Sequence, residues 1–384
     1  HGYLLPGYSV DPVLWLRRIW LHHLKRMNMS GVVFLLVAVA SSPLLRAVDA
    51  FSGVVPNFIK SSLPAVTPKA NNILILDHVN WNHEKGRHDW LKAFYFDWLQ
   101  CAVDPRKEEN MAKNKKTLWA NMGAHQFHLP EGTPQAQVLD GLITLVYPTL
   151  DGIRKRENKY ISFLEGSEAK LLEETSSSIL LMDPWGTQFR LVDASSSQLT
   201  GRDARGVQAR GDTSEAWGMS DVTFYTNQDC NFPGIGRYYE TVLGAQCAVH
   251  SNSCIVSVGP NQSLTFRRHP DPLKKVSHVD LKETDEGTSN WGPHVSMYVA
   301  DFKATYERAA EFQLTYVNPR FKRRAYNLEE ALDQCMFRCI DIIDPENQAA
   351  GPIIQLEHEI RSVTNVDGSK YKSCPFDEIP MQCK

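Results

Sequence analysis

The sequence is short of several features on which common protein functions depend. Only eight of its 384 residues are cysteines and no two form a CxxC pair, which argues against a disulfide scaffold and a structural zinc motif. The 41 Lys and Arg residues are balanced by 44 Asp and Glu residues, so the net charge of −3 supplies no basic field and we expect no nucleic-acid partner. A GxSxG nucleophile motif and a GxxxxGK(S/T) phosphate-binding loop are also lacking.

The composition that is present, 42% hydrophobic and 22% charged residues, is typical of a globular protein. Residues 196–216 are rich in Gly, Ser, Arg and Asp and nearly devoid of apolar side chains, as expected of a linker. This segment separates residues 72–195 from residues 217–363, and each range is long enough to bury a core. We therefore predict two domains with these boundaries and a polar tail over residues 364–384.

The amino-terminal part has the character of leader and targeting sequence. The chain begins at His1, and residues 1–26 are aromatic and basic, which predicts a leader or translated upstream sequence. Residues 27–50 have the layout of a signal peptide, because an apolar core over 32–40 follows basic residues and precedes small ones. This core is shorter than the roughly 18 to 20 apolar residues of a membrane-spanning helix, so we expect no stable membrane insertion.

Residues 51–71 contain Lys, Ser and Pro but no carboxylate, which is the composition of a transit peptide. A signal peptide joined to such a segment at Ala50-Phe51 resembles the bipartite plastid-targeting leader of algae with complex plastids, in which an Ala-Phe junction is typical. The resemblance implies delivery to the plastid through the secretory route. Plain secretion is the alternative.

One short pattern occurs four times in the rest of the chain. Units beginning at residues 73, 141, 220 and 293 each read as a strand, a helix and then two or three strands. In the second unit the helix is expected over 151–158 and the next strand over 159–164. Two details repeat as well: an aromatic pair in a helix, at Phe94-Tyr95 and Tyr238-Tyr239, and an Asp-Pro turn before a final strand, at Asp183-Pro184 and Asp344-Pro345.

These repeated stretches resemble the vicinal oxygen chelate superfamily, which includes glyoxalase I, bleomycin-resistance proteins, fosfomycin-resistance enzymes and extradiol dioxygenases. Membership implies an α+β fold of four βαβββ modules forming two glyoxalase-like incomplete-barrel domains, each around a cavity. The matching stretches are, in order, DHVNWN, AFYFDWLQ, HQFHLPEG, GLITLV, LLMDPWGTQFRLVD, PHVSMYVAD and IIDPENQAAGPIIQLEHE, which together span most of the chain after residue 72.

In metal-using members of the superfamily, side chains from the first and last strands of two modules converge on one divalent ion. Imidazole and carboxylate ligands suit Zn²⁺, Ni²⁺, Fe²⁺ or Mn²⁺. The resemblance matches these positions to His78 and His128 in module one, Leu142 and Arg190 in module two, Asp221 and Thr265 in module three, and His294 and Gln355 in module four, where Glu357 follows on the same strand face.

Three arrangements are compatible with these residues. In the first, consecutive modules pair, and a metal is held either by His78 and His128 or by Asp221, His294 and Glu357. In the second, module one pairs with module four, so that His78, His128, His294 and Glu357 share the ion. In the third, no metal is bound and the cavities hold a planar or amphipathic small molecule.

The leading expectation is a metal-dependent lyase, isomerase or dioxygenase, similar to lactoylglutathione lyase, that acts on a small oxygen-bearing substrate. In that case the resemblance makes Glu357 the catalytic residue, while Arg190 and Gln355 contact the substrate. The alternative is a metal-free small-ligand-binding protein of the bleomycin-resistance type, with Arg190 facing an anionic group, or a non-catalytic component of a plastid assembly.

A further histidine pair lies in the stretch HEKGRH, residues 83–88, which looks like the helix motif of zinc proteases. His83 and His88 are five residues apart rather than four, and Gly86 interrupts the stretch. A helix cannot direct both imidazoles at one ion with that spacing. We therefore expect no metal site of this kind.

Overall fold

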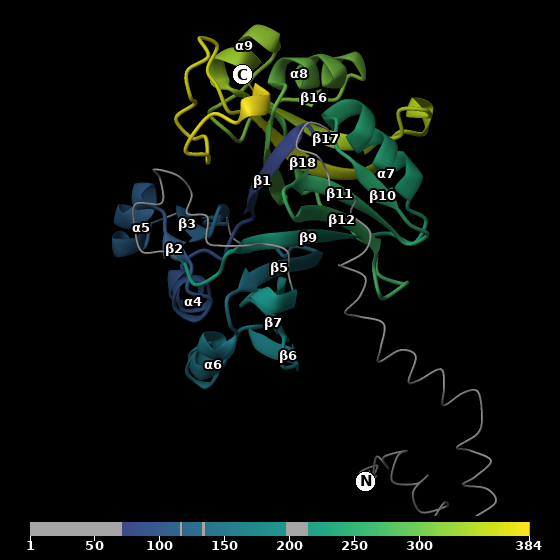
Figure 1. Cartoon of the computed structure of the whole chain (residues 1–384). Coiled ribbons are helices and arrows are strands. Elements are labelled where there is room, and N and C mark those ends of the chain that lie inside the picture. Colours follow the sequence, from purple (N-terminus) through teal and green to yellow (C-terminus); the bar gives the residue numbers. More distant parts are fainter. Residues whose placement is uncertain (1–70, 116, 133–134, 197–213, 384) are drawn as a thin grey trace, which may run out of the picture. The chain divides into compact units, whose positions relative to one another are not determined.

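The computed structural model describes residues 71–115, 117–132, 135–196 and 214–383 (Figure 1). The predicted leader and targeting segments 1–26, 27–50 and 51–71 lie outside the described residues, apart from Asn71, so plastid delivery stays a prediction. No helix in the described ranges has the length and apolar character needed to cross a membrane.

Four βαβββ modules follow one another along the chain. Module one contains β1 (Ile73–Asn80), α4 (His88–Leu91) with its π-helical continuation Lys92–Trp98, β2 (Ala102–Val103), α5 (Glu108–Lys113), β3 (Thr117–Met122) and β4 (His125–Pro130). Module two contains β5 (Gly141–Tyr147), α6 (Asp151–Phe163), β6 (Lys170–Glu174), β7 (Ser178–Met182) and β8 (Gln188–Asp193).

The second half of the chain repeats the pattern. Module three contains β9 (Gly218–Thr226), α7 (Phe232–Tyr238) with the π-helical segment Tyr239–Leu243, β10 (Cys247–Val249), β11 (Ser253–Gly259) and β12 (Gln262–Arg268). Module four contains β15 (His294–Val299), α8 (Phe302–Glu311), β16 (Thr315–Tyr316), α9 (Leu328–Gln334), β17 (Met336–Ile343) and β18 (Pro352–Ser362). A hairpin of β13 (Leu281–Thr284) and β14 (Gly287–Asn290) is inserted between these two modules.

Modules pair in a nested order rather than consecutively. Modules one and four form the first sheet, in the strand order β16-β17-β18-β15-β1-β4-β3-β2, and modules two and three form the second sheet, in the order β10-β11-β12-β9-β5-β8-β7-β6. Antiparallel pairing of β1 with β15 and of β5 with β9 joins the modules within each sheet. In Figure 1, β1 accordingly lies beside strands from the end of the chain.

The predicted fold class is confirmed: the chain is α+β, with four βαβββ modules forming two glyoxalase-like incomplete barrels that stay open between their edge strands. The predicted ranges 72–195 and 217–363 each supply strands to both sheets. The strand expected over 159–164 is wrong, because α6 continues to Phe163. Ile153, Tyr160 and Leu164 are all buried, and their spacing continues the apolar stripe of this helix.

Aromatic side chains connect the two sheets through one apolar core. The ring centroid of Phe189 on β8 lies 5.9 Å from those of Tyr95 and Phe127, which belong to module one. The Tyr95 hydroxyl also donates a 2.8 Å hydrogen bond to Asp183 in the turn before β8. The repeated Asp-Pro turn therefore anchors a helix of one module to the last strand of another.

Candidate functional sites

The inner face of the first sheet brings together three histidines at the matched positions: His78 on β1, His128 on β4 and His294 on β15. The imidazoles of His78 and His128 stack with centroids 3.7 Å apart, and the His294 ring lies 5.8 Å from that of His78. All three side chains are buried. The nested pairing produces this cluster, because it places β4, β1 and β15 side by side in the middle of the sheet.

Carboxylates and guanidinium groups complete the cluster. Arg338 on β17 forms buried ion pairs with both Glu357 and Glu359 of β18, and Arg361 also pairs with Glu359. Glu357 accepts further hydrogen bonds from Asn290 at 3.0 Å and Asn318 at 2.8 Å. Both carboxylates are therefore engaged by cations or amide donors.

The charge states in this cluster follow from burial and from these ion pairs. Burial opposes ionisation of Glu359, but Arg338 and Arg361 outweigh it and hold the pKa of Glu359 well below its usual range. Burial lowers the pKa of His78, against a 2.7 Å contact with Asp77 that raises it. Burial and the Arg338 charge lower the pKa of His294 well below its usual value. These shifts favour the neutral imidazole in His78 and His294 and the ionised carboxylate in Glu359.

The cluster resembles the expected metal site in one atom only. His78 Nε2 is buried without a hydrogen-bond partner among the described residues, as expected of a nitrogen that could bind a metal. The other groups do not complete a ligand set. An ion bound by two imidazoles lies in the plane of both rings, whereas His78 and His128 stack face to face with an interplanar angle of 23°. Glu357 and Glu359 face Arg338 instead of an open position.

Aromatic side chains cover this face, Phe321 from a loop and Trp119 from β3 of the same sheet. The Phe321 ring packs edge-on against His294 at 5.5 Å, and the Arg338 guanidinium lies 4.0 Å from the centre of the same ring. Trp119 stacks on His128 at 4.4 Å. The inner face of the first sheet is thus a covered polar core, and its residues do not fit the ligand geometry of a four-residue metal centre.

The inner face of the second sheet is more exposed. Leu142 and Thr144 on β5, Leu180 on β7 and Arg190 on β8 are all half-buried. Thr144 and Leu180 are the direct cross-strand neighbours of Arg190. The Arg190 side chain is 30% exposed, donates a 3.2 Å hydrogen bond to Ser178 and lies 3.7 Å from Glu173. This face therefore offers a cation between a hydroxyl group and an apolar side chain.

Asp221 lies on the same sheet, two strands from Arg190. Three hydroxyl groups donate to its carboxylate, Thr223 and Thr265 at 2.6 Å and Ser263 at 2.5 Å. Burial raises the pKa of Asp221 against these hydrogen bonds. His294 and Glu357 belong to the first sheet, so the expected set of Asp221, His294 and Glu357 does not come together around one ion.

Gln355 also lies apart from Arg190, because it belongs to β18 of the first sheet. Its side-chain amide donates a 2.7 Å hydrogen bond to Asp341. These two residues, both expected to contact substrate, cannot line a common subsite on one sheet. Arg338 and Glu359 were missed by the sequence analysis, although a single Arg in the apolar run MFRCIDII and a second Glu on the face of Glu357 were both visible.

A separate cluster lies at the ends of β1 and β4. One ligand atom from each of His83, His88 and Glu131 lies within 4.8 Å of the other two. His83 and His88 meet without a helix, because α4 begins only at His88 and a turn with Gly86 at φ +79° precedes it, so the argument from helical spacing does not apply to them. A parallel bridge then pairs His83 with Glu131.

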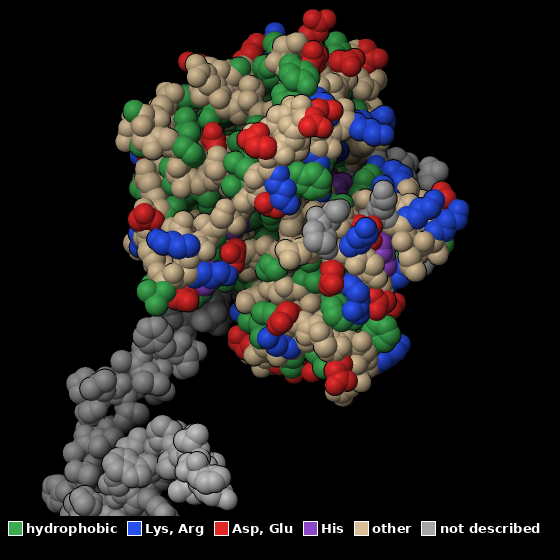
Figure 2. Space-filling model, turned by 180° about the vertical axis from the view of Figure 1, so that it is seen from behind, with side chains coloured by type: hydrophobic (Ala, Val, Ile, Leu, Met, Phe, Trp, Pro, Cys, Tyr) green, Lys and Arg blue, Asp and Glu red, His purple; other side chains and the backbone are tan. Residues whose placement is uncertain are grey.

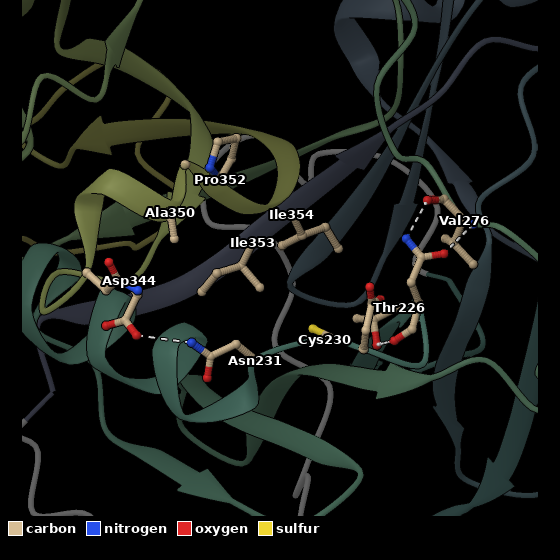
Figure 3. Close-up of a pocket in the computed structure, with 13 residues that line it drawn as sticks. Thr226, Cys230, Asn231, Val276, Asp344, Ala350, Pro352, Ile353 and Ile354 are labelled. Atoms are coloured by element: carbon tan, nitrogen blue, oxygen red, sulfur yellow. Dashed lines mark hydrogen bonds between the residues drawn. The ribbon is translucent and has the colours of Figure 1, made fainter.

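A small pocket of about 200 Å³ lies between the end of β9, the start of α7 and the turn before β18 (Figure 3). Its floor includes Ile353 and Ile354, and Asn231 at its rim donates a 3.0 Å hydrogen bond to Asp344. The volume is below the roughly 300 to 1,000 Å³ usual for small-molecule sites.

Figure 2 shows Lys and Arg side chains interspersed with Asp and Glu side chains over the visible face.

Comparisons with known proteins concern the fold. No family model and no curated protein matches the sequence. A candidate dioxygenase of Bacillus subtilis has 13% identity over 82% of this chain and 94% of its own, with a TM-score of 0.44. A glyoxalase I variant of Zea mays has 11% identity over 76% and 94% of the two chains, with a TM-score of 0.42. The 2,3-dioxygenase LapB of Pseudomonas sp. KL28 has 10% identity over 76% and 93%, with a TM-score of 0.27.

These similar structures are those of two dioxygenases and one glyoxalase I. At such identities and TM-scores the likeness says nothing about the activity of this chain. Any function has to be argued from its own side chains.

Proposed function

We propose that this chain is a vicinal oxygen chelate superfamily protein that binds an anionic planar or amphipathic small molecule on the inner face of the second sheet, without a metal ion at that face. The observation that carries the proposal is the half-exposed guanidinium of Arg190 between Thr144 and Leu180. On the first sheet, by contrast, the guanidinium of Arg338 is buried and paired with two carboxylates.

The chemistry of the second sheet suits such a ligand. A guanidinium group can donate two parallel hydrogen bonds to a carboxylate, sulfonate or phosphate. Glu173, the acidic neighbour of Arg190, is 55% exposed and 3.7 Å away, so an incoming anion can replace it at little cost. Leu142 and Leu180 supply apolar area for a planar ring next to the anion.

The test is equilibrium binding of 8-anilinonaphthalene-1-sulfonate, an anionic planar probe, to the full-length protein. We expect saturable binding that Arg190→Gln weakens by about 10-fold or more, the cost of losing a charge-assisted hydrogen bond. Arg154→Gln is the matched control, because Arg154 is also 30% exposed and paired with a neighbouring carboxylate, Glu174. Equal affinity in wild type and Arg190→Gln, or equal losses in both variants, contradicts the proposal.

A second candidate function is the metal-dependent lyase, isomerase or dioxygenase, and the unpartnered Nε2 of His78 favours it. In that case the stacked rings of His78 and His128 would have to turn before they could hold a divalent ion together with His294, and such an ion would polarise a substrate oxygen. Asp77 would hold the His78 ring through its Nδ1. Loss of bound metal in His78→Asn would support this candidate, whereas unchanged metal content would exclude it.

A further inference from the structure

We propose that His83, His88 and Glu131 form a binding site for a divalent transition-metal ion of the Zn²⁺ class, separate from the histidine cluster of the first sheet. The three residues come from the segment after β1, the first turn of α4 and the residue after β4. Their ligand atoms lie within 4.8 Å of one another. Two imidazoles and one carboxylate are a common ligand set for Zn²⁺.

The hydrogen bonds of the two imidazoles leave lone pairs for an ion. His83 Nδ1 lies 3.2 Å from the carbonyl oxygen of Leu129, and His88 Nε2 lies 2.7 Å from that of Lys115. A carbonyl oxygen can only accept, so both of these ring nitrogens carry the proton. The remaining nitrogen of each neutral ring, Nε2 of His83 and Nδ1 of His88, then has a lone pair. Backbone carbonyls hold metal-ligating histidines in the same manner in known sites.

Burial supplies an independent indication. The His83 side chain is fully buried, with 0% exposure, and its Nε2 has no hydrogen-bond partner within the part of the chain that the structure describes. A purely hydrogen-bonded cluster would be expected to pair this atom, because an unsatisfied buried polar group is costly. A metal ion would satisfy it.

Glu131 provides the negative charge and access to solvent. Its side chain is half-buried, and its Oε1 accepts a 2.9 Å hydrogen bond from the Gly86 amide. Three protein ligands leave a fourth tetrahedral position for water or another ligand. The ion would thereby fasten the turn over residues 84–87 to the ends of β1 and β4.

The experiment is a Zn²⁺ titration of chelator-stripped full-length protein in competition with a chromophoric chelator. We expect close to one equivalent of tight binding and a rise in the thermal midpoint. His83→Ala should weaken binding by at least about 100-fold, beyond the 10- to 100-fold effect of losing an outer-shell partner. Glu131→Gln, which keeps the shape of a half-buried side chain, should weaken it by at least about 10-fold.

His78→Asn is the control variant and should bind Zn²⁺ like the wild type. No stoichiometric binding by the wild type overturns the proposal, as does wild-type affinity in Glu131→Gln. If far-UV circular dichroism shows that His83→Ala is unfolded, Glu131→Gln alone decides. Loss of binding in His78→Asn with retention in Glu131→Gln also overturns it, and would favour the metal-dependent candidate for the first sheet.

Discussion

The two sheets are built from the same kind of module pair, yet the arginines on their inner faces differ in exposure and in ion pairing. In the first sheet, Arg338 is 5% exposed and paired with two buried carboxylates under Phe321. In the second, Arg190 is 30% exposed and has one distant acidic neighbour. Arg338 is on β17 and Arg190 is on β8, the last strand of its module, so the two positions are not equivalent. The side chains around each arginine decide whether it stabilises the fold or can meet a ligand.

The largest difference between the two sheets is expected when each of the two arginines is replaced by methionine in turn. Arg338→Met leaves Glu357 and Glu359 buried without their principal partner, so we expect the free energy of unfolding to fall by about 3–5 kcal/mol. Arg190→Met should cost under about 1 kcal/mol, because its ion pair is exposed. Urea unfolding monitored by circular dichroism measures both. Similar losses would mean that the two faces do not differ as described.

A change of pH should act mainly on the first sheet. His78 and His294 have folded pKa values below the usual 6.5, so the unfolded chain binds protons that the folded chain does not. Stability is therefore lost as pH falls below about 6.5, by up to about 1.4 kcal/mol per pH unit for each histidine. Glu359, whose pKa is depressed, adds a loss of the same sign at more acidic pH. Urea midpoints between pH 7.5 and 5.5 measure the slope, which His294→Asn should reduce.

Two matched tyrosines give a milder test between the sheets. Tyr95 donates to the buried carboxylate of Asp183, whereas the hydroxyl of Tyr239 lies 2.6 Å from the neutral imidazole of His358, whose pKa burial lowers to about 4. Tyr95→Phe should cost about 1.5–3 kcal/mol and Tyr239→Phe about 1 kcal/mol, because hydrogen bonds to charged groups are stronger. Thermal unfolding of both variants measures the difference. A larger loss in Tyr239→Phe would contradict this reasoning.

The smallest effect on stability is expected from Glu173→Gln. This change removes the exposed partner of Arg190 and should alter the free energy of unfolding by less than about 0.5 kcal/mol. Affinity for 8-anilinonaphthalene-1-sulfonate should rise, because the anion no longer competes with a carboxylate. A weaker affinity in this variant would indicate that the probe binds elsewhere.

The fold class was predictable because alternation and helical spacing repeat four times along the chain. His78, His128 and His294 could also be predicted, because the family resemblance matches them to ligand positions on the first or last strand of a module. The pairing of modules could not be predicted, because local patterns do not specify which first strands pair when they are more than 200 residues apart, as β1 and β15 are. The ion pairs of Arg338 depend on that pairing, and they could not be derived without it.

The cluster of His83, His88 and Glu131 was missed for a different reason. The spacing of its histidines was interpreted on a helix, although Gly86 interrupts that stretch. A glycine with positive φ allows a turn, and in a turn a five-residue spacing does not separate the two rings. Gly86, which argued against a zinc-protease helix motif, thus permits the contact between His83 and His88.

The nested strand order determines which sheet can form first while the chain is being synthesised. Modules two and three occupy one continuous stretch, so the second sheet can assemble once β12 has emerged, at Arg268. The first strand of the chain, β1, waits for its antiparallel partner β15, and the first sheet is complete only after β18, which ends at Ser362. At about 5–20 residues per second, the 94 residues between these points take roughly 5–20 s. Until β15 has emerged, β1 lacks its antiparallel partner and His78 lacks its neighbour His294, so a chaperone that shields β1 would have its main opportunity in the early part of that interval.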